Sequence, residues 1–112
     1  MRYLLLIGGD GSDAPDLSSK DICEADDALA WVEDVKRRGA YVSGEVLRPA
    51  DDATTVRVRD GEVLLADGPF AETKEQIGGL AVIDCANLDE AVAIAAAHPV
   101  ARFGLVEVRP LW

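Results

Sequence analysis

The apolar positions of this chain fall into short runs typical of strands and longer runs with helical spacing. Residues 3–7 form a continuous apolar run ended by glycines, which is too short for a helix and predicts a buried strand. Apolar residues then recur at steps of three and four over residues 22–35, which predicts an amphipathic helix that stops at Gly39 after a basic last turn. Residues 41–47 follow as a predicted strand, with Gly44 as a candidate bulge.

The strongest local signal is a β-hairpin. Residues 54–59 and 62–66 are rich in β-forming residues, and Asp60 and Gly61 between them supply the positive φ angles of a tight turn. Side chains alternate along a strand, so the two valines of the first run are expected on one face and its two arginines together on the other.

The last third of the chain returns to the order strand, helix, strand. Residues 80–85 predict a strand, and Asn87 with Glu90 three residues later is close to a capping box for an alanine-rich helix over 88–97. Residues 104–109 predict the final strand. The full order is β-α-β, hairpin, β-α-β, which predicts an α+β ferredoxin-like sandwich with an antiparallel sheet, two helices on one face and an added hairpin.

The length of 112 residues allows a single domain, residues 1–112, and limits what can cover the sheet. A sheet with helices on one face leaves its other face open. A second copy of the chain is the simplest cover, so we expect a homodimer that packs sheet against sheet, in the manner of a dimeric α/β barrel.

The charge of the chain limits its partners. It carries 21 acidic against 11 basic residues, a net charge of −10, which repels a phosphate backbone or an anionic membrane, so neither nucleic acid nor membrane is expected as a partner. The opening apolar run is too short for a signal peptide, and two separated cysteines indicate reduced thiols, so we expect a cytoplasmic protein. The 5% aromatic content predicts a core of aliphatic side chains.

Neither a cofactor nor a metal is expected. Residues 9–14 match the G-x-G-x-x-A pattern of dinucleotide sites, but Pro15 delays the following helix and acidic residues would face the pyrophosphate. The same loop lacks the ligand set of a calcium site. One histidine and the separated Cys23 and Cys85 cannot assemble a zinc site.

His98 is the only histidine and has two readings. Its position at the end of the second long helix, just before Pro99, predicts a partly charged imidazole that interacts with the last helix carbonyls. The other reading is catalytic, although no serine lies in the G-x-S-x-G context of a nucleophile elbow.

Asp67 also has two readings, because it is expected where a strand ends, followed by a turn at Gly68 and Pro69. Partial desolvation there would raise its pKa toward the range of proton exchange. Alternatively, its carboxylate accepts backbone N–H bonds and holds the turn. Gly78 and Gly79 farther on predict a hinge or bulge where the chain enters the next strand.

The sequence DGPFAETKE at 67–75, with TVR at 55–57 and VEVRP at 106–110, resembles the DGPF-type branch of the YCII-related family over the whole chain. The resemblance implies a dimeric ferredoxin-like α+β fold and a pocket near the dimer interface, with Asp67 in its floor. Related YCII-type proteins have been proposed to be small-molecule enzymes with a His and Asp pair, the histidine lying in the first helix. Residues 25–38 contain no histidine here. DGPF-type proteins are also linked to extracytoplasmic sigma factors, which implies a signalling or accessory role.

Two hypotheses follow. In the first, a dimeric enzyme acts on a small polar metabolite, with an acid/base carboxylate, arginines that anchor a substrate carboxylate or phosphate, an apolar wall and a lysine that neutralises developing negative charge. Its candidate residues are Asp67 and His98 as catalytic groups and Arg57, Pro69, Phe70, Lys74 and Arg109 as substrate-binding groups. The plainer reading of the arginines is surface pairing with acids such as Glu107. In the second hypothesis the chain is a non-catalytic module that binds a protein such as a sigma factor.

Overall fold

The computed structural model describes residues 1–12, 17–70 and 75–112. Its strands are β1 (Arg2–Gly9), β2 (Tyr41–Val46), β3 (Thr54–Arg59), β4 (Glu62–Asp67), β5 (Gln76–Asp84) and β6 (Leu105–Pro110). Its helices are α1 (Ser19–Cys23), α2 (Asp26–Arg37) and α3 (Leu88–Ala96), with short 3-10 turns η1 (Ala50–Asp52) and η2 (Pro99–Arg102).

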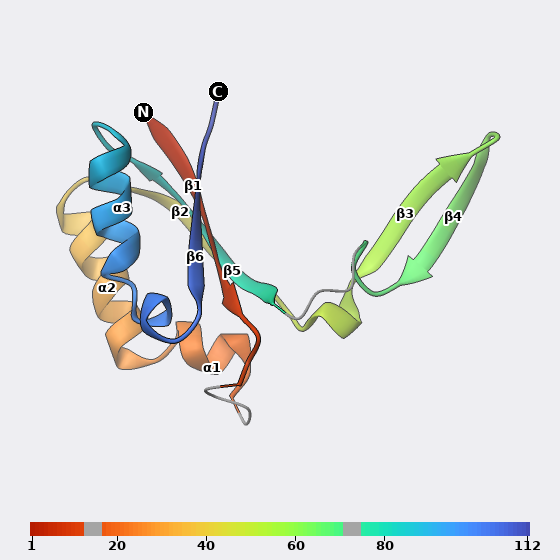
Figure 1. Ribbon diagram of the computed structural model, residues 1–112, viewed down its shortest axis with the longest axis horizontal. Coiled ribbons are helices and arrows are strands. Elements are labelled where there is room, and N and C mark those ends of the chain that lie inside the picture. Colours follow the sequence, from red (N-terminus) through yellow and green to blue (C-terminus); the bar gives the residue numbers. More distant parts are fainter. Residues whose placement is uncertain (13–16, 71–74) are drawn as a thin grey trace.

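Four strands form one antiparallel sheet in the order β2-β5-β1-β6. With the hairpin β3–β4 set aside, this is the strand order of a ferredoxin-like fold, so the predicted α+β class is confirmed. The long helices α2 and α3 lie on the same side of this sheet (Figure 1). No helix within the described ranges is long and apolar enough to cross a bilayer.

The core lies between that helical layer and the sheet. Strand β1 buries every second side chain on the helix side, with Leu5 completely enclosed. The indole of Trp31 from α2 lies in this core, and its Nε1 donates a hydrogen bond of 2.8 Å to the Ile94 carbonyl of α3. Tyr3 is buried as well, so the core is less purely aliphatic than the low aromatic content predicted.

The predicted single helix over residues 22–35 is wrong, because two helices share that periodicity. Ser18 and Asp21 form a capping box that starts α1, and the chain leaves helical geometry at Ala25, whose ψ is 153°. The helix α2 then starts with Asp26 and Asp27, whose negative charges suit a helix N-terminus.

Two bulges adjust the sheet. The predicted bulge at Gly44 is wrong: the pairing of β2 with β5 skips Val42, so that residue is the bulged one. A side chain at Gly44 would instead collide with the Tyr41 hydroxyl, since an added Cβ would lie 2.4 Å from it. The predicted irregularity at Gly78 is confirmed, because β1 pairs with the residues on either side of it.

The hairpin β3–β4 forms a separate two-stranded sheet, here called the arm (residues 54–67), and the rest of the described chain is called the body. Asp60 (φ 52°) and Gly61 (φ 80°) make the predicted tight turn. The arm projects away from the body (Figure 1). The Cα radius of gyration is 15.6 Å, against about 13 Å for a compact domain of this length.

The core assignment predicts different costs for two leucine truncations. Leu5→Ala should lower the free energy of unfolding by about 2–5 kcal/mol, because it leaves a cavity between sheet and helices. The matched change Leu29→Ala removes a side chain on α2 that is 48% exposed, and should cost less than about 1 kcal/mol. Urea unfolding of both variants measures the difference, and equal losses would contradict the assigned core.

Candidate functional site at the base of the arm

The turn that follows β4 is held by its own backbone and by one threonine. Gly68 adopts a φ of 93°, a conformation that favours glycine. Its N–H donates to the Ala53 carbonyl at 2.7 Å, and its own carbonyl accepts a 2.7 Å hydrogen bond from the Thr55 hydroxyl. These bonds close the base of the arm.

Asp67 is the last residue of β4, lies opposite Thr54 and is exposed. Within the part of the chain that the structure describes, nothing donates a hydrogen bond to its carboxylate, so the turn does not depend on Asp67 accepting backbone N–H groups.

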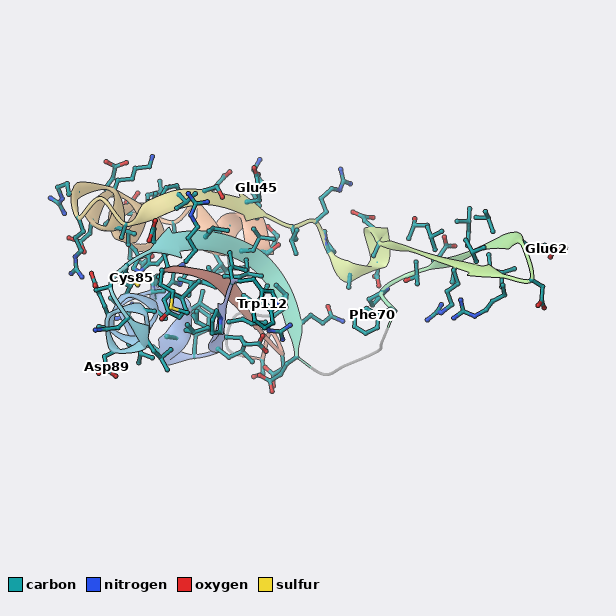
Figure 2. The ribbon with its side chains drawn as sticks, turned by 90° about the horizontal axis from the view of Figure 1, so that it is seen from above. Glu45, Glu62, Phe70, Cys85, Asp89 and Trp112 are labelled. Atoms are coloured by element: carbon teal, nitrogen blue, oxygen red, sulfur yellow. The ribbon has the colours of Figure 1, made fainter. Side chains whose placement is uncertain are left out.

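A cleft of about 820 Å³ lies where the arm joins the body. This volume is in the range of small-molecule sites, about 300–1,000 Å³. The cleft is lined by Leu47, Arg48, Pro49, Ala50, Asp52, Ala53, Pro69, Phe70, Glu75, Gln76 and Ile77. Pro69 and Phe70 therefore form part of an apolar wall, and Phe70, which is 83% exposed, is seen between body and arm in Figure 2.

The main cationic group of this cleft is Arg48, which the sequence reading missed. Its Nε donates to the Asp52 carboxylate at 2.9 Å, and its two terminal nitrogens have no partner among the described residues. Guanidinium groups of this kind bind carboxylate or phosphate oxygens. The sequence signal that could have found Arg48 is its position before Pro49, directly after the predicted strand at 41–47.

Asp67 lies beside the cleft without lining it. Its neighbour Gly68 is hydrogen-bonded to Ala53, which does line the cleft. Within one chain Asp67 is therefore close to this lining in sequence but is not part of it.

His98 lies in the body, packed against Trp31 with ring centroids 4.8 Å apart in an edge-on arrangement. The imidazole is 3% exposed, and its Nδ1 accepts a 3.1 Å hydrogen bond from the Val100 N–H, capping η2. Burial lowers its pKa to about 4, despite the opposing effect of Asp27. The expected partly charged imidazole at helix carbonyls is therefore wrong: the ring is neutral and acts as an acceptor. Within one chain the structure does not bring it to Asp67 on the arm.

The other candidate side chains are spread over the fold. Arg109 on β6 forms an ion pair with Glu107, which is the surface pairing that the sequence analysis gave as the alternative to substrate binding. Arg57 projects from the polar face of the arm opposite Leu64, and the described residues include no acid paired with it. Lys74 lies outside the described residues. One chain therefore does not gather the two arginines at one site.

The two thiols are protonated, and the described residues form no metal-binding cluster. Burial raises the pKa of both Cys23 and Cys85, which keeps these thiols protonated and poor nucleophiles. Across residues 1–12, 17–70 and 75–112, no group of three or more histidine, cysteine or acidic side chains could hold a metal ion.

The ferredoxin-like sheet with two helices on one side and a hairpin inserted between β2 and β5 defines the class as small α+β proteins. A family model described as the YCII-related domain matches residues 1–112, so the chain belongs to the YCII-related family. It is also similar to an uncharacterised protein of Rhizobium meliloti (strain 1021), with 51% identity over 69 residues. That match covers 58% of this chain and 54% of the relative, about half of the relative's length.

The lowered pKa of His98 makes stability depend on pH. His98 takes up a proton near pH 6.5 in the unfolded chain and only near pH 4 in the folded chain. The neutral ring therefore contributes its full stabilisation of the folded state above about pH 6.5, and this stabilisation is lost as the pH falls toward 4. The full loss is roughly 3 kcal/mol. His98→Asn keeps a side-chain acceptor for the Val100 N–H but does not titrate.

The check is urea unfolding of wild type and His98→Asn at a series of pH values. Both proteins share the same carboxylates, so the difference between their unfolding free energies isolates the imidazole. We expect wild type to lose stability relative to the variant between pH 6.5 and 4. Parallel curves would show that the pKa of His98 is the same in the folded and the unfolded chain.

Proposed function

We propose that this YCII-related protein binds a small polar metabolite in the cleft at the base of the arm and acts on it by acid/base chemistry, with Asp67 as the proton carrier. The observation that carries the proposal is the cleft of about 820 Å³, whose lining includes Pro69 and Phe70 of the motif. Asp67 and Gly68 directly precede these two residues, and the Gly68 N–H donates a hydrogen bond to the carbonyl of Ala53 in the cleft lining.

The chemistry follows from the groups that meet there. The terminal nitrogens of Arg48 suit an anionic group of the metabolite, and Pro69 and Phe70 suit its apolar part. The Asp67 carboxylate is exposed in a single chain. A carboxylate becomes a stronger base when bound substrate removes its water, and positioned proton transfer contributes about 10²–10⁴ in rate.

A homodimer belongs to this proposal. On the face of the sheet away from the helices, Leu4 lies opposite Val82 and Leu6 opposite Leu80, and all four side chains are only half-buried. A second copy packed sheet to sheet would remove this surface from water. That packing is also the source of additional walls for a site that one chain leaves open.

A second candidate is a non-catalytic module that binds a protein such as a sigma factor. It is favoured by the burial of His98, which leaves Asp67 without an imidazole partner in the same chain. In this case a metabolite is not required, and the base of the arm presents a surface to the partner.

A thermal-shift screen against a panel of small polar metabolites separates the two candidates. A ligand that binds the folded state must raise the melting temperature, by an amount that grows with its concentration over Kd. We expect a metabolite that stabilises wild type and fails to stabilise Asp67→Asn.

The matched control is Asp60→Asn, which also removes one carboxylate from the arm and suits the positive φ at the hairpin turn. It should respond to the metabolite as wild type does. No response from any of the three proteins, with all three folded, would favour the protein-binding module. A ligand that stabilises all three equally would place the site away from Asp67.

A further inference from the structure

The two strands of the arm segregate their side chains by face. The register pairs Val56 with Leu65 and Val58 with Val63, so these four aliphatic side chains lie on one face. They are 59%, 68%, 58% and 65% exposed respectively. The opposite face carries Thr55, Arg57, Arg59, Glu62, Leu64 and Ala66. The alternation thus gives the arm an apolar face along these four side chains, with Thr54 and Asp67 on the same face at its base.

Within the described chain, that face has no cover. The strands β3 and β4 pack on each other, and no helix or strand of the body packs against them to a comparable extent. Figure 2 shows the arm standing clear of the body, with Glu62 near its tip. A lone two-stranded hairpin is at best marginally stable in water, so the arm needs a surface to lie on.

We propose that the apolar face of the arm docks on the body of a second copy of this chain, and that the two copies clasp each other reciprocally. The first reason is that the body carries its own uncovered apolar surface, the open sheet face around Leu4, Leu6, Leu80 and Val82. Both surfaces belong to one chain but lie on separate parts of it, so pairing between two copies covers both.

The second reason is area. Four strands about 4.8 Å apart and about 20 Å long present roughly 400 Å², and the two strands of the arm roughly 200 Å². A stable interface buries about 800 Å² of accessible surface on each partner. The sheet face or the arm alone offers less than this area, whereas a dimer that buries the sheet face and the arm together comes closer to it.

The third reason is the charge on the other face of the arm. Arg57 and Arg59 lie on the face opposite the four aliphatic side chains. An arm that docks by its apolar face keeps both guanidinium groups in water, whereas docking by the polar face would bury them.

This inference goes beyond the proposed function and does not rest on it. A clasp by the arm could exist without catalysis, and a sheet-to-sheet dimer could bind a metabolite with its arms free. The experiment therefore measures association rather than turnover.

The test compares two identical substitutions on adjacent residues of β4. Leu65→Glu places a charge on the apolar face, and Leu64→Glu places the same charge on the polar face opposite Arg57. In a single chain Leu65 is the more exposed, at 68% against 46%, so chain stability alone predicts that Leu64→Glu is the more harmful. The clasp predicts the reverse order for association.

Sedimentation velocity across a dilution series measures the dimer Kd of all three proteins. We expect dimeric wild type, an unchanged Kd for Leu64→Glu, and a Kd weakened about tenfold or more for Leu65→Glu. Circular dichroism and melting of each variant at low concentration establish that the body is folded. Amide exchange over residues 54–67 should also slow as wild type is concentrated.

Three results would overturn the clasp. Dimerisation of Leu65→Glu with wild-type affinity would leave a sheet-packed dimer standing and show that the arm is not part of it. Equal weakening by both variants would show that the charge, and not the face, matters. A monomeric wild type, even one that captures another protein through the arm, would exclude the second copy as the occupant.

Discussion

One-sided cover of the sheet is the constraint on which the rest of this structure depends. The helices α2 and α3 lie on the same side, so β1 buries Leu5 fully while its neighbours Leu4 and Leu6 are only half-buried. A chain of 112 residues could have supplied more cover by folding the segment between β2 and β5 back over the sheet. Residues 54–67 of that segment instead form the projecting arm. The open sheet face and the exposed arm therefore have the same cause, since the hairpin between β2 and β5 projects from the body and does not cover the sheet.

The core contacts of the body, by contrast, do not involve the arm. Trp31 joins the two long helices through its hydrogen bond to the Ile94 carbonyl and packs against the neutral ring of His98. His98 in turn caps η2 through Val100, which leads the chain into β6. These contacts assign the only histidine to structure. The function proposed above therefore relies on residues at the base of the arm, which lie outside the core.

Much of the fold could be predicted from the sequence because its signals are local. The Asp60-Gly61 turn, the Asn87 cap and the apolar run of β1 each specify one element, and together they gave the ferredoxin-like order. The prediction of a single first helix failed because α1 and α2 share one continuous pattern of apolar positions. The helical periodicity runs through Ala25 without a break, so only backbone geometry separates α1 from α2.

The site was less predictable for a physical reason. Pro69 and Phe70 were found because they belong to a sequence motif, and the cleft does include them. Arg48 was missed because it approaches them only in three dimensions, across the junction of arm and body. A contact of that kind leaves no spacing pattern in the chain. The positions of Arg57 and Asp67 relative to a second copy are hidden from a single sequence in the same way.

The geometry of the cleft and the position of the arm cannot be separated. One side of the cleft, Leu47 to Pro49, continues from β2 in the body, whereas Pro69 and Phe70 follow the last strand of the arm. Any rotation of the arm about its base therefore changes the distance between the two walls. A second copy that holds the arm would also hold the cleft in one shape, which reduces the ordering cost of binding. Association and ligand binding would then reinforce each other, since by linkage a ligand that prefers the held shape must also strengthen the dimer.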